Sequence, residues 1–137
     1  MNRRDFQNIC RKRIKESTVL IKTKNYDGAY YLGGYSIECA LKSCIAKLIK
    51  KNDFPDKKFI NDAHTHNLLN LIKLAELERE LDNEISRDTA FGINWNIVKD
   101  WNESSRYQTH DEQVVNNFYR AIINKKSGVL KWVKKYW

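Results

Sequence analysis

Apolar residues recur at intervals of three and four along most of the chain, and runs of strict alternation are absent. Because this spacing returns once per helical turn, it predicts helices and argues against strands. We expect a single all-helical domain over residues 1–137, built as an up-and-down bundle of about five helices. No internal repeat interrupts the pattern, and the clearest loop surrounds Pro55, the one proline of the sequence.

The two amino-terminal helices have the strongest patterns. The first is predicted over residues 2–23, with an apolar face and a basic face. The second follows a turn near residues 25–30, in which Asn25 or Asp27 serves as the helix cap. Two adjacent glycines, Gly33 and Gly34, each cost roughly 1 kcal/mol relative to alanine inside a helix. They therefore predict close packing or a bound group. The apolar seam of this helix consists of Tyr30, Gly34, Ile37, Leu41, Cys44 and Leu48.

Shorter helical segments are predicted after the Pro55 loop. The stretch AHTHNLLNLIKLA gives a short helix with Leu68, Ile72 and Ala75 facing inward. Residues 77–85 and 90–101 form one broken helix or two short ones. The inward face of the second segment is predicted to consist of Ile93, Ile97 and Trp101.

The last helix is predicted to begin at Thr109 and to extend toward residue 137. Thr109 and Glu112 have the spacing of a capping box, in which two side chains satisfy free backbone N–H groups at a helix start. A kink is expected at Ser127–Gly128. The inner side of this helix is predicted to consist of Val115, Tyr119, Ile122, Leu130, Val133 and Trp137.

The charge balance favours an anionic partner. Lys and Arg number 25 against 17 Asp and Glu, a formal net charge of +8. Nucleic acid comes ahead of lipid because the pattern contains no membrane-type segment. The alternative is a basic, soluble surface without a ligand. The three scattered cysteines and the basic amino terminus, which lacks an apolar signal core, predict a cytoplasmic protein whose cysteines are buried apolar side chains.

Charged and histidine residues in the first half of the chain favour structural roles. His64 and His66 form a His-x-His pair without a further Cys or His cluster, so capping or turn packing is expected in place of metal binding. We expect no metal and no cofactor. Glu38 and Lys42 are spaced i, i+4 and interrupt an apolar stripe, which predicts a packed ion pair that fixes helix register.

Arg106 and His110 are the candidates for chemistry. With a helix starting at Thr109, Arg106 lies in the incoming turn and His110 in the first helical turn. A helix start attracts phosphate and disfavours imidazolium, and a guanidinium holds phosphate through two hydrogen bonds. These groups suit metal-free attack by an RNA 2′-hydroxyl on its own phosphate. The alternative is that both residues only satisfy a turn and a helix end.

Four segments together resemble the HEPN family of small prokaryotic helical domains. They are YDGAYYLGGYSIECALKSCI, HTHNLLNL, WNESSRY and VLKWVKKYW. The resemblance implies a bundle of four or five helices that commonly forms a homodimer. Many members are metal-independent ribonucleases of toxin–antitoxin, phage-defence or stress systems. They often work beside a small nucleotidyltransferase (MNT-type) antitoxin.

In active members of this family, an Arg and a His from each subunit meet at the dimer cleft. Arg106 and His110 match that motif, although the spacer of three residues is shorter than the usual one. Two functions follow as alternatives: a metal-independent endoribonuclease, or a non-catalytic module that binds a nucleotide, RNA or a nucleotidyltransferase partner. The remaining candidates for binding or for shaping the cleft are Glu38, Lys42, Tyr107, Tyr31, Tyr35 and His66.

Overall fold

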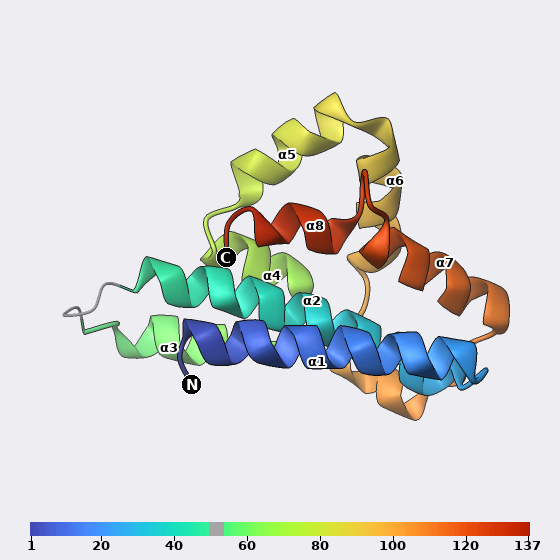
Figure 1. The fold of residues 1–137 in the computed structure, drawn as a ribbon. Helices are drawn as coiled ribbons and strands as arrows, with labels where there is room; N and C mark the ends of the chain where they lie inside the picture. Colours follow the sequence, from blue (N-terminus) through green and yellow to red (C-terminus); the bar gives the residue numbers. More distant parts are fainter. Residues whose placement is uncertain (50–53) are drawn as a thin grey trace.

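The computed structural model describes residues 1–49 and 54–137, and all the regular structure in these ranges is helical (Figure 1). The all-α prediction is confirmed. The number of helices is larger than the five expected, because the last predicted helix is divided in two and the short helices Lys57–Ala63 and Glu103–Tyr107 were not predicted. In chain order the elements are α1 (Arg3–Lys22), α2 (Tyr26–Leu48), α3 (Lys57–Ala63), α4 (Leu68–Leu74), α5 (Glu78–Arg87), α6 (Thr89–Val98), the 3-10 helix η1 (Glu103–Tyr107), α7 (Glu112–Ile123) and α8 (Val129–Lys134).

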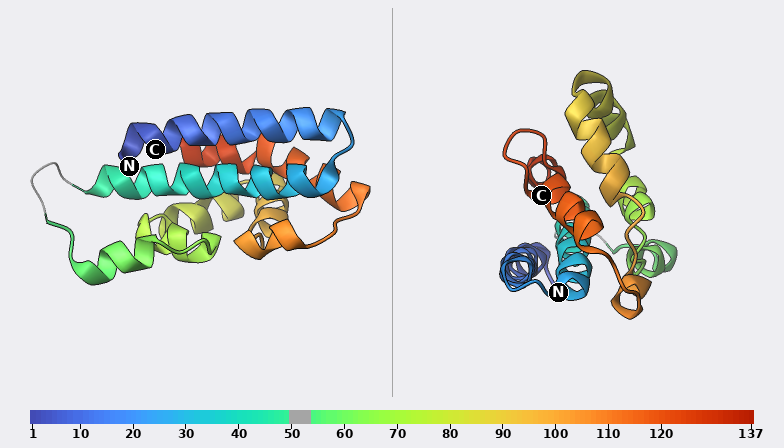
Figure 2. Two further views of the ribbon diagram at one scale, coloured as in Figure 1. Left: turned by 90° about the horizontal axis from the view of Figure 1, so that it is seen from below. Right: turned by 90° about the vertical axis from the view of Figure 1, so that its right-hand side faces the viewer.

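The long helices α1 and α2 lie side by side and antiparallel (Figures 1 and 2). Local capping sets where α1 begins: the Asn2 side chain accepts from the Asp5 N–H at 3.0 Å, and the Asp5 carboxylate accepts from the Asn2 N–H at 2.9 Å. This reciprocal pair satisfies two backbone donors that have no partner within the helix. After α1 the chain turns through Lys24, which has a left-handed φ of 61°.

Helix α2 is the centre of the bundle, and it packs against α1, α4, α7, α8 and η1. Gly34 explains how one of these neighbours comes so close. A Cβ at Gly34 would lie well under 3.0 Å from the indole of Trp101, which is itself only 2% exposed. Gly34 thus serves close packing, one of the two explanations that the sequence allowed for the glycine pair. Leu48, at the end of the predicted seam, is 42% exposed.

The core between α2 and the later helices is rich in aromatic side chains. Trp101, Trp132, Phe91 and Phe118 are the largest of its fully buried residues. The Phe91 and Trp132 rings lie 5.3 Å apart, which joins α6 to α8. In Figure 1, α8 lies between α2 and α5, and α5 and α6 lie on the side of α8 away from α1. Figure 2 shows the same arrangement from two further sides.

The last predicted helix is in fact two helices. Its expected kink at Ser127–Gly128 is a complete break, because Asn124 ends α7 and its side-chain oxygen accepts from the N–H groups of Lys126 at 3.0 Å and Ser127 at 2.7 Å. The Ser127 hydroxyl also donates to Asp88 at 2.8 Å. Of the predicted inner side chains, Tyr119 and Trp137 are half-buried; those fully buried are Val115, Ile122, Leu130 and Val133.

The second divided segment is the one between residues 77 and 101. Of the two arrangements predicted, two short helices are present, and Asp88 caps the second by accepting from the Phe91 N–H at 3.2 Å. The inward face predicted for α6 was wrong for Ile93 and Ile97, which are 59% and 37% exposed. Because α6 is apolar nearly all round, spacing alone does not choose its face. The side chains that face the core are Phe91, Trp95 and Val98, followed by Trp101 beyond the helix.

Three smaller expectations concern the loop, the cysteines and a membrane. Residues 50–53 of the predicted Pro55 loop lie outside the described residues, and residues 54–56 precede α3 without helical structure. The three cysteines are free and buried, and burial raises their thiol pKa to about 11 for Cys10 and about 12 for Cys39 and Cys44. None of the described helices has the length and apolar character that a bilayer crossing requires.

Candidate functional site

A buried carboxylate on α2 organises one side of the candidate site. Glu38 is only 1% exposed, and its Oε1 accepts from Lys42 Nζ at 2.9 Å and lies 2.9 Å from His66 Nδ1. The ion pair expected between Glu38 and Lys42 therefore forms. A buried carboxylate is stable only when charged or hydrogen-bonding partners compensate its lost hydration. One of these partners is His66, which lies in the turn before α4.

His66 extends this network to a third element. Its Nε2 lies 3.1 Å from Glu103 Oε2, at the first residue of η1. Both ring nitrogens thus face carboxylate oxygens, and both contacts are hydrogen bonds when each nitrogen carries a proton. His66 connects α2 to the short helix on which Arg106 stands. It does more than the capping or turn packing expected of it, while His64 is simply the C-cap residue of α3.

Metal binding is a separate question for these side chains. Over residues 1–49 and 54–137, the structure contains no group of three or more His, Cys, Asp or Glu side chains placed to hold a metal ion. One oxygen of each carboxylate beside His66, Glu38 Oε1 and Glu103 Oε2, pairs with protein groups, while Glu38 Oε2 is buried without a hydrogen-bond partner among the described residues.

Arg106 lies on η1 and is exposed. Asn102 caps η1 by accepting from the Ser104 N–H at 2.9 Å, and the preceding Trp101 is buried against α2. The Arg106 guanidinium lies 4.7 Å over the ring of Tyr107. Electrostatic interaction with Tyr107 is the main influence that raises the pKa of Arg106, and contact with Tyr31 adds to it. Arg106 is therefore a permanent cation held against aromatic rings.

Aromatic residues continue from η1 onto α2. The rings of Tyr31 and Tyr35 stack with centroids 6.1 Å apart, and Tyr31 lies at the same distance from Trp101. Tyr31 and Tyr35 are half-buried, whereas Tyr107 is 79% exposed. An exposed aromatic ring beside a guanidinium is a suitable surface for a nucleobase, because every base has a face that stacks.

His110 packs against a different face of α2 from the one that Arg106 contacts. Its ring stacks on Tyr30 with centroids 4.0 Å apart, and its backbone N–H donates to Asp27 Oδ1 at 2.7 Å. Its Nε2 is buried without a hydrogen-bond partner among the described residues. An unpaired buried polar atom typically costs about 1–3 kcal/mol, so a hydrogen bond to this nitrogen would be favourable.

A pocket of about 300 Å³ adjoins His110 at the start of α2. The cap residue Asn25 makes no side-chain capping bond. Within the described ranges, no hydrogen bond reaches the N–H groups of Tyr26, Asp27 or Gly28. Free N–H groups and the positive end of the helix dipole together favour an anion. The pocket is lined by Lys24, Asn25, Tyr26, Asp27, Gly28 and His110.

The helix start predicted at Thr109 was wrong. Helix α7 begins at Glu112, and its cap is Asp111, whose carboxylate accepts from the N–H groups of Gln113 at 3.1 Å and Val114 at 3.3 Å. A carboxylate directly before the helix is a strong cap, and it displaces the hydroxyl of Thr109 from that role. His110 therefore precedes α7, and the open helix start beside it belongs to α2.

The structure places Arg106 and His110 against neighbouring faces of α2 without joining them. No hydrogen bond, ion pair or ring contact links the two side chains in the described part of the chain. Arg106 contacts Tyr31 and His110 contacts Tyr30, and successive residues of a helix point about 100° apart. The segment before α7 thus brings both residues to the beginning of α2, on neighbouring faces of that helix.

Sequence reasoning missed three contributors to this arrangement. Tyr30 was assigned to the core seam, and Asp27 was considered only as a cap. Glu103 had no distinguishing signal, because a single acidic residue in a polar turn is ordinary. Only the packing of η1 on α2 brings Glu103 to His66.

Comparison with known proteins agrees with the helical architecture. A model of the HEPN domain matches residues 4–136, nearly the whole chain. The chain belongs to the HEPN domain family, a family of ribonuclease-like defence and toxin modules. Searches among curated proteins and among solved structures found no match.

Proposed function

We propose that this protein engages RNA at the beginning of α2, with Arg106 and His110 as its principal contacts, and that it acts as a metal-independent endoribonuclease. The observation that carries the proposal is the position of His110 beside an open helix start, with Arg106 over the adjoining face. Phosphate is the anion that such a site favours. Membership of the HEPN family supports RNA as the molecule that carries this phosphate.

Binding would combine charge and stacking. A phosphate at the start of α2 would accept from the free N–H groups and meet the ammonium of Lys24, which lines the same pocket. The Asp27 carboxylate also lies there, so the phosphate must sit away from the oxygen that accepts from His110. A base stacked on Tyr107 would add about 1–3 kcal/mol.

Catalysis would use His110 as a general base and Arg106 as an electrostatic clamp. His110 takes the proton of a ribose 2′-hydroxyl, whose oxygen then attacks the adjacent phosphorus. The phosphorus–5′-oxygen bond breaks, and the leaving oxygen takes up a proton from water. The products are a 2′,3′-cyclic phosphate and a 5′-hydroxyl. The Arg106 guanidinium stabilises the negative charge that develops on the phosphoryl oxygens.

A homodimer would bring two such sites together. Arg106 and His110 of one chain touch different faces of α2, so a second copy would supply the Arg–His pairing that a single chain does not make. A small nucleotidyltransferase antitoxin is proposed as the regulatory partner. Both partners are inferences from the family.

The alternative is a module that binds RNA or a nucleotide without cleaving it. The buried, unpaired Nε2 of His110 favours this alternative, because a general base must reach the proton that it removes. The spacer of three residues between Arg106 and His110 favours it too.

RNA cleavage and binding by the purified protein in EDTA separate these proposals. We expect cleavage by the wild type, a loss of at least about 100-fold in His110→Ala, and retention in His64→Ala, which changes the exposed C-cap histidine that follows α3. Binding without cleavage would establish the non-catalytic alternative. Equal cleavage by His110→Ala would remove His110 from the mechanism, and absence of both binding and cleavage would refute RNA engagement.

A further inference from the structure

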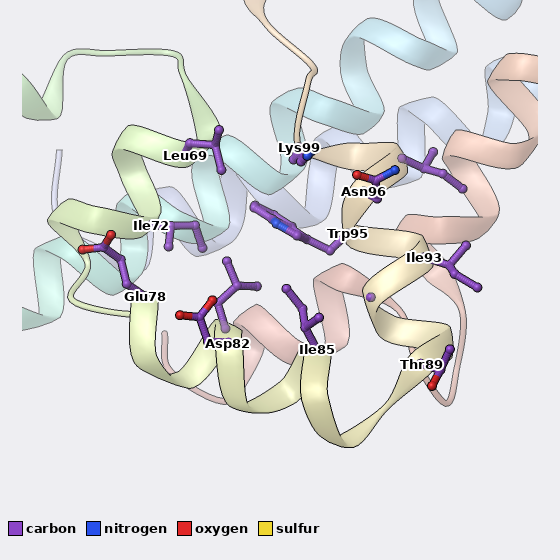
Figure 3. Close-up of a pocket in the computed structure, with 13 residues that line it drawn as sticks. Leu69, Ile72, Glu78, Asp82, Ile85, Thr89, Ile93, Trp95, Asn96 and Lys99 are labelled. Carbon is purple, nitrogen blue, oxygen red and sulfur yellow. The ribbon is translucent and has the colours of Figure 1, made fainter.

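A groove between α4, α5 and α6 lies apart from the residues assigned to RNA (Figure 3). It encloses about 780 Å³. The Trp95 ring points into it from α6, and Ile72 and Leu81 complete its buried floor. Four large apolar side chains around it remain substantially exposed: Leu69 at 48%, Ile85 at 37%, Ile93 at 59% and Ile97 at 37%.

The exposed apolar residues follow the axis of a helix. Ile93 and Ile97 are one turn apart on α6, so they form an apolar edge along that wall. An exposed patch of this kind, rimmed by polar residues, commonly marks a protein interaction site. An amphipathic helix laid into such a groove would bury its apolar stripe.

The opposite wall defines the charge of the occupant. Glu78 and Asp82 lie one turn apart on the exposed side of α5, and neither makes an ion pair or side-chain hydrogen bond with the described residues. Lys99 also lines the groove, so its charged groups are two carboxylates and one ammonium. This acidic wall belongs to a chain of net charge +8. Charge complementarity therefore selects a basic occupant.

We infer that this groove docks a basic amphipathic helix of another protein. A second copy of the chain suits it less well, because the described basic helix α1 exposes one large apolar side chain, Val19, and no apolar stripe. The inferred partner places its apolar stripe against Ile93 and Ile97. Its lysines or arginines, one turn apart, meet Glu78 and Asp82.

The test uses two synthetic helices of about fourteen residues, roughly 21 Å long. Both have leucines at positions i, i+3, i+4 and i+7; the other positions are lysines in one helix and glutamates in the other. Binding of the labelled helices to the full chain is measured by fluorescence anisotropy. We expect saturable binding of the lysine helix and none of the glutamate helix.

Matched variants locate the binding. Ile93→Ser should raise the Kd about tenfold, while Val19→Ser, at a residue 58% exposed on α1, leaves it unchanged. Asp82→Asn should raise the Kd about twofold to fivefold, and Asp62→Asn, at an exposed position of α3, should not. Because these four positions are exposed, their side chains contribute little to the core.

Three outcomes would overturn the inference. One is equal binding to Ile93→Ser and Val19→Ser, and another is absence of binding or equal affinity for the glutamate helix. The third is self-association of the protein alone in sedimentation velocity that Ile93→Ser abolishes, since a second copy would then occupy the groove. RNA cleavage is predicted to survive Ile93→Ser, so this test fails or succeeds independently of the RNA proposal.

Discussion

Gly34→Ala is a sharp test of how α2 positions η1. The added methyl would lie well under 3.0 Å from the Trp101 indole, which is itself buried. Relieving the clash requires Trp101 or α2 to move, and overpacking of this kind costs about 1–3 kcal/mol. Alanine returns about 1 kcal/mol of helix propensity. Taking the upper end of the overpacking range, we expect a net destabilisation of about 2 kcal/mol.

Gly33→Ala is the matched control, since it makes the same change one residue earlier. There the methyl would meet Ser17 Oγ at 3.3 Å and Phe118 at 3.4 Å, contacts that small adjustments relieve. The clash and the gain in helix propensity should nearly cancel, which leaves the free energy of unfolding within about 1 kcal/mol of the wild type.

Equilibrium urea unfolding of both variants, followed by circular dichroism, measures this difference. A Trp101→Leu background should remove most of the extra effect of Gly34→Ala, because the two positions are in contact and their effects are not additive. If Gly34→Ala proved as stable as Gly33→Ala, the tight packing of Trp101 on α2 would be wrong.

Three further predictions concern the hydrogen-bond network, the thiols and the exposed aromatic residue. His66→Ala should destabilise the protein by about 1–3 kcal/mol, because Glu38 loses a hydrogen-bond partner. It should also speed amide hydrogen exchange in η1, because η1 loses its link to α2. Unchanged exchange in η1 would refute that link. The three buried thiols should resist a thiol reagent at pH 8 until denaturant is added, since burial raises each thiol pKa to about 11 or 12. Because the unfolded thiols release protons first, the free energy of unfolding should fall as pH rises above about 9, and a flat profile between pH 9 and 11 would contradict the burial. Tyr107→Ala should weaken RNA binding by about 1–3 kcal/mol in anisotropy titrations, whereas Tyr107→Phe should preserve it, because stacking requires the ring and not the hydroxyl.

Much of the helical architecture could be predicted because its determinants are local. The start of α1 depends on Asn2 and Asp5, three residues apart, and the break after α7 on Asn124 and its immediate successors. The ion pair of Glu38 and Lys42 follows from one helical turn. Such features need no knowledge of the rest of the fold.

The predictions that failed involved competition between local signals. Thr109 has good capping chemistry, but Asp111 offers a carboxylate to the same helix and is the cap. Ile93 and Ile97 have core spacing, but the large ring of Trp95 occupies the buried side of α6. The sequence therefore allowed two caps for α7 and two buried faces for α6, and it did not choose between them.

The sequence by itself determined the helical class and the candidacy of Arg106 and His110, because residue type and short spacing set these features. For Gly34 it left close packing and a bound group as alternatives, and the contact with Trp101 decided between them. Only the tertiary structure decided that the helix start beside His110 is that of α2. It also decided that His66 links Glu38 to Glu103, a contact between residues far apart in the chain. The physical reason is that hydrogen bonds and ring stacking act over a few ångströms, and packing alone brings distant residues within that range.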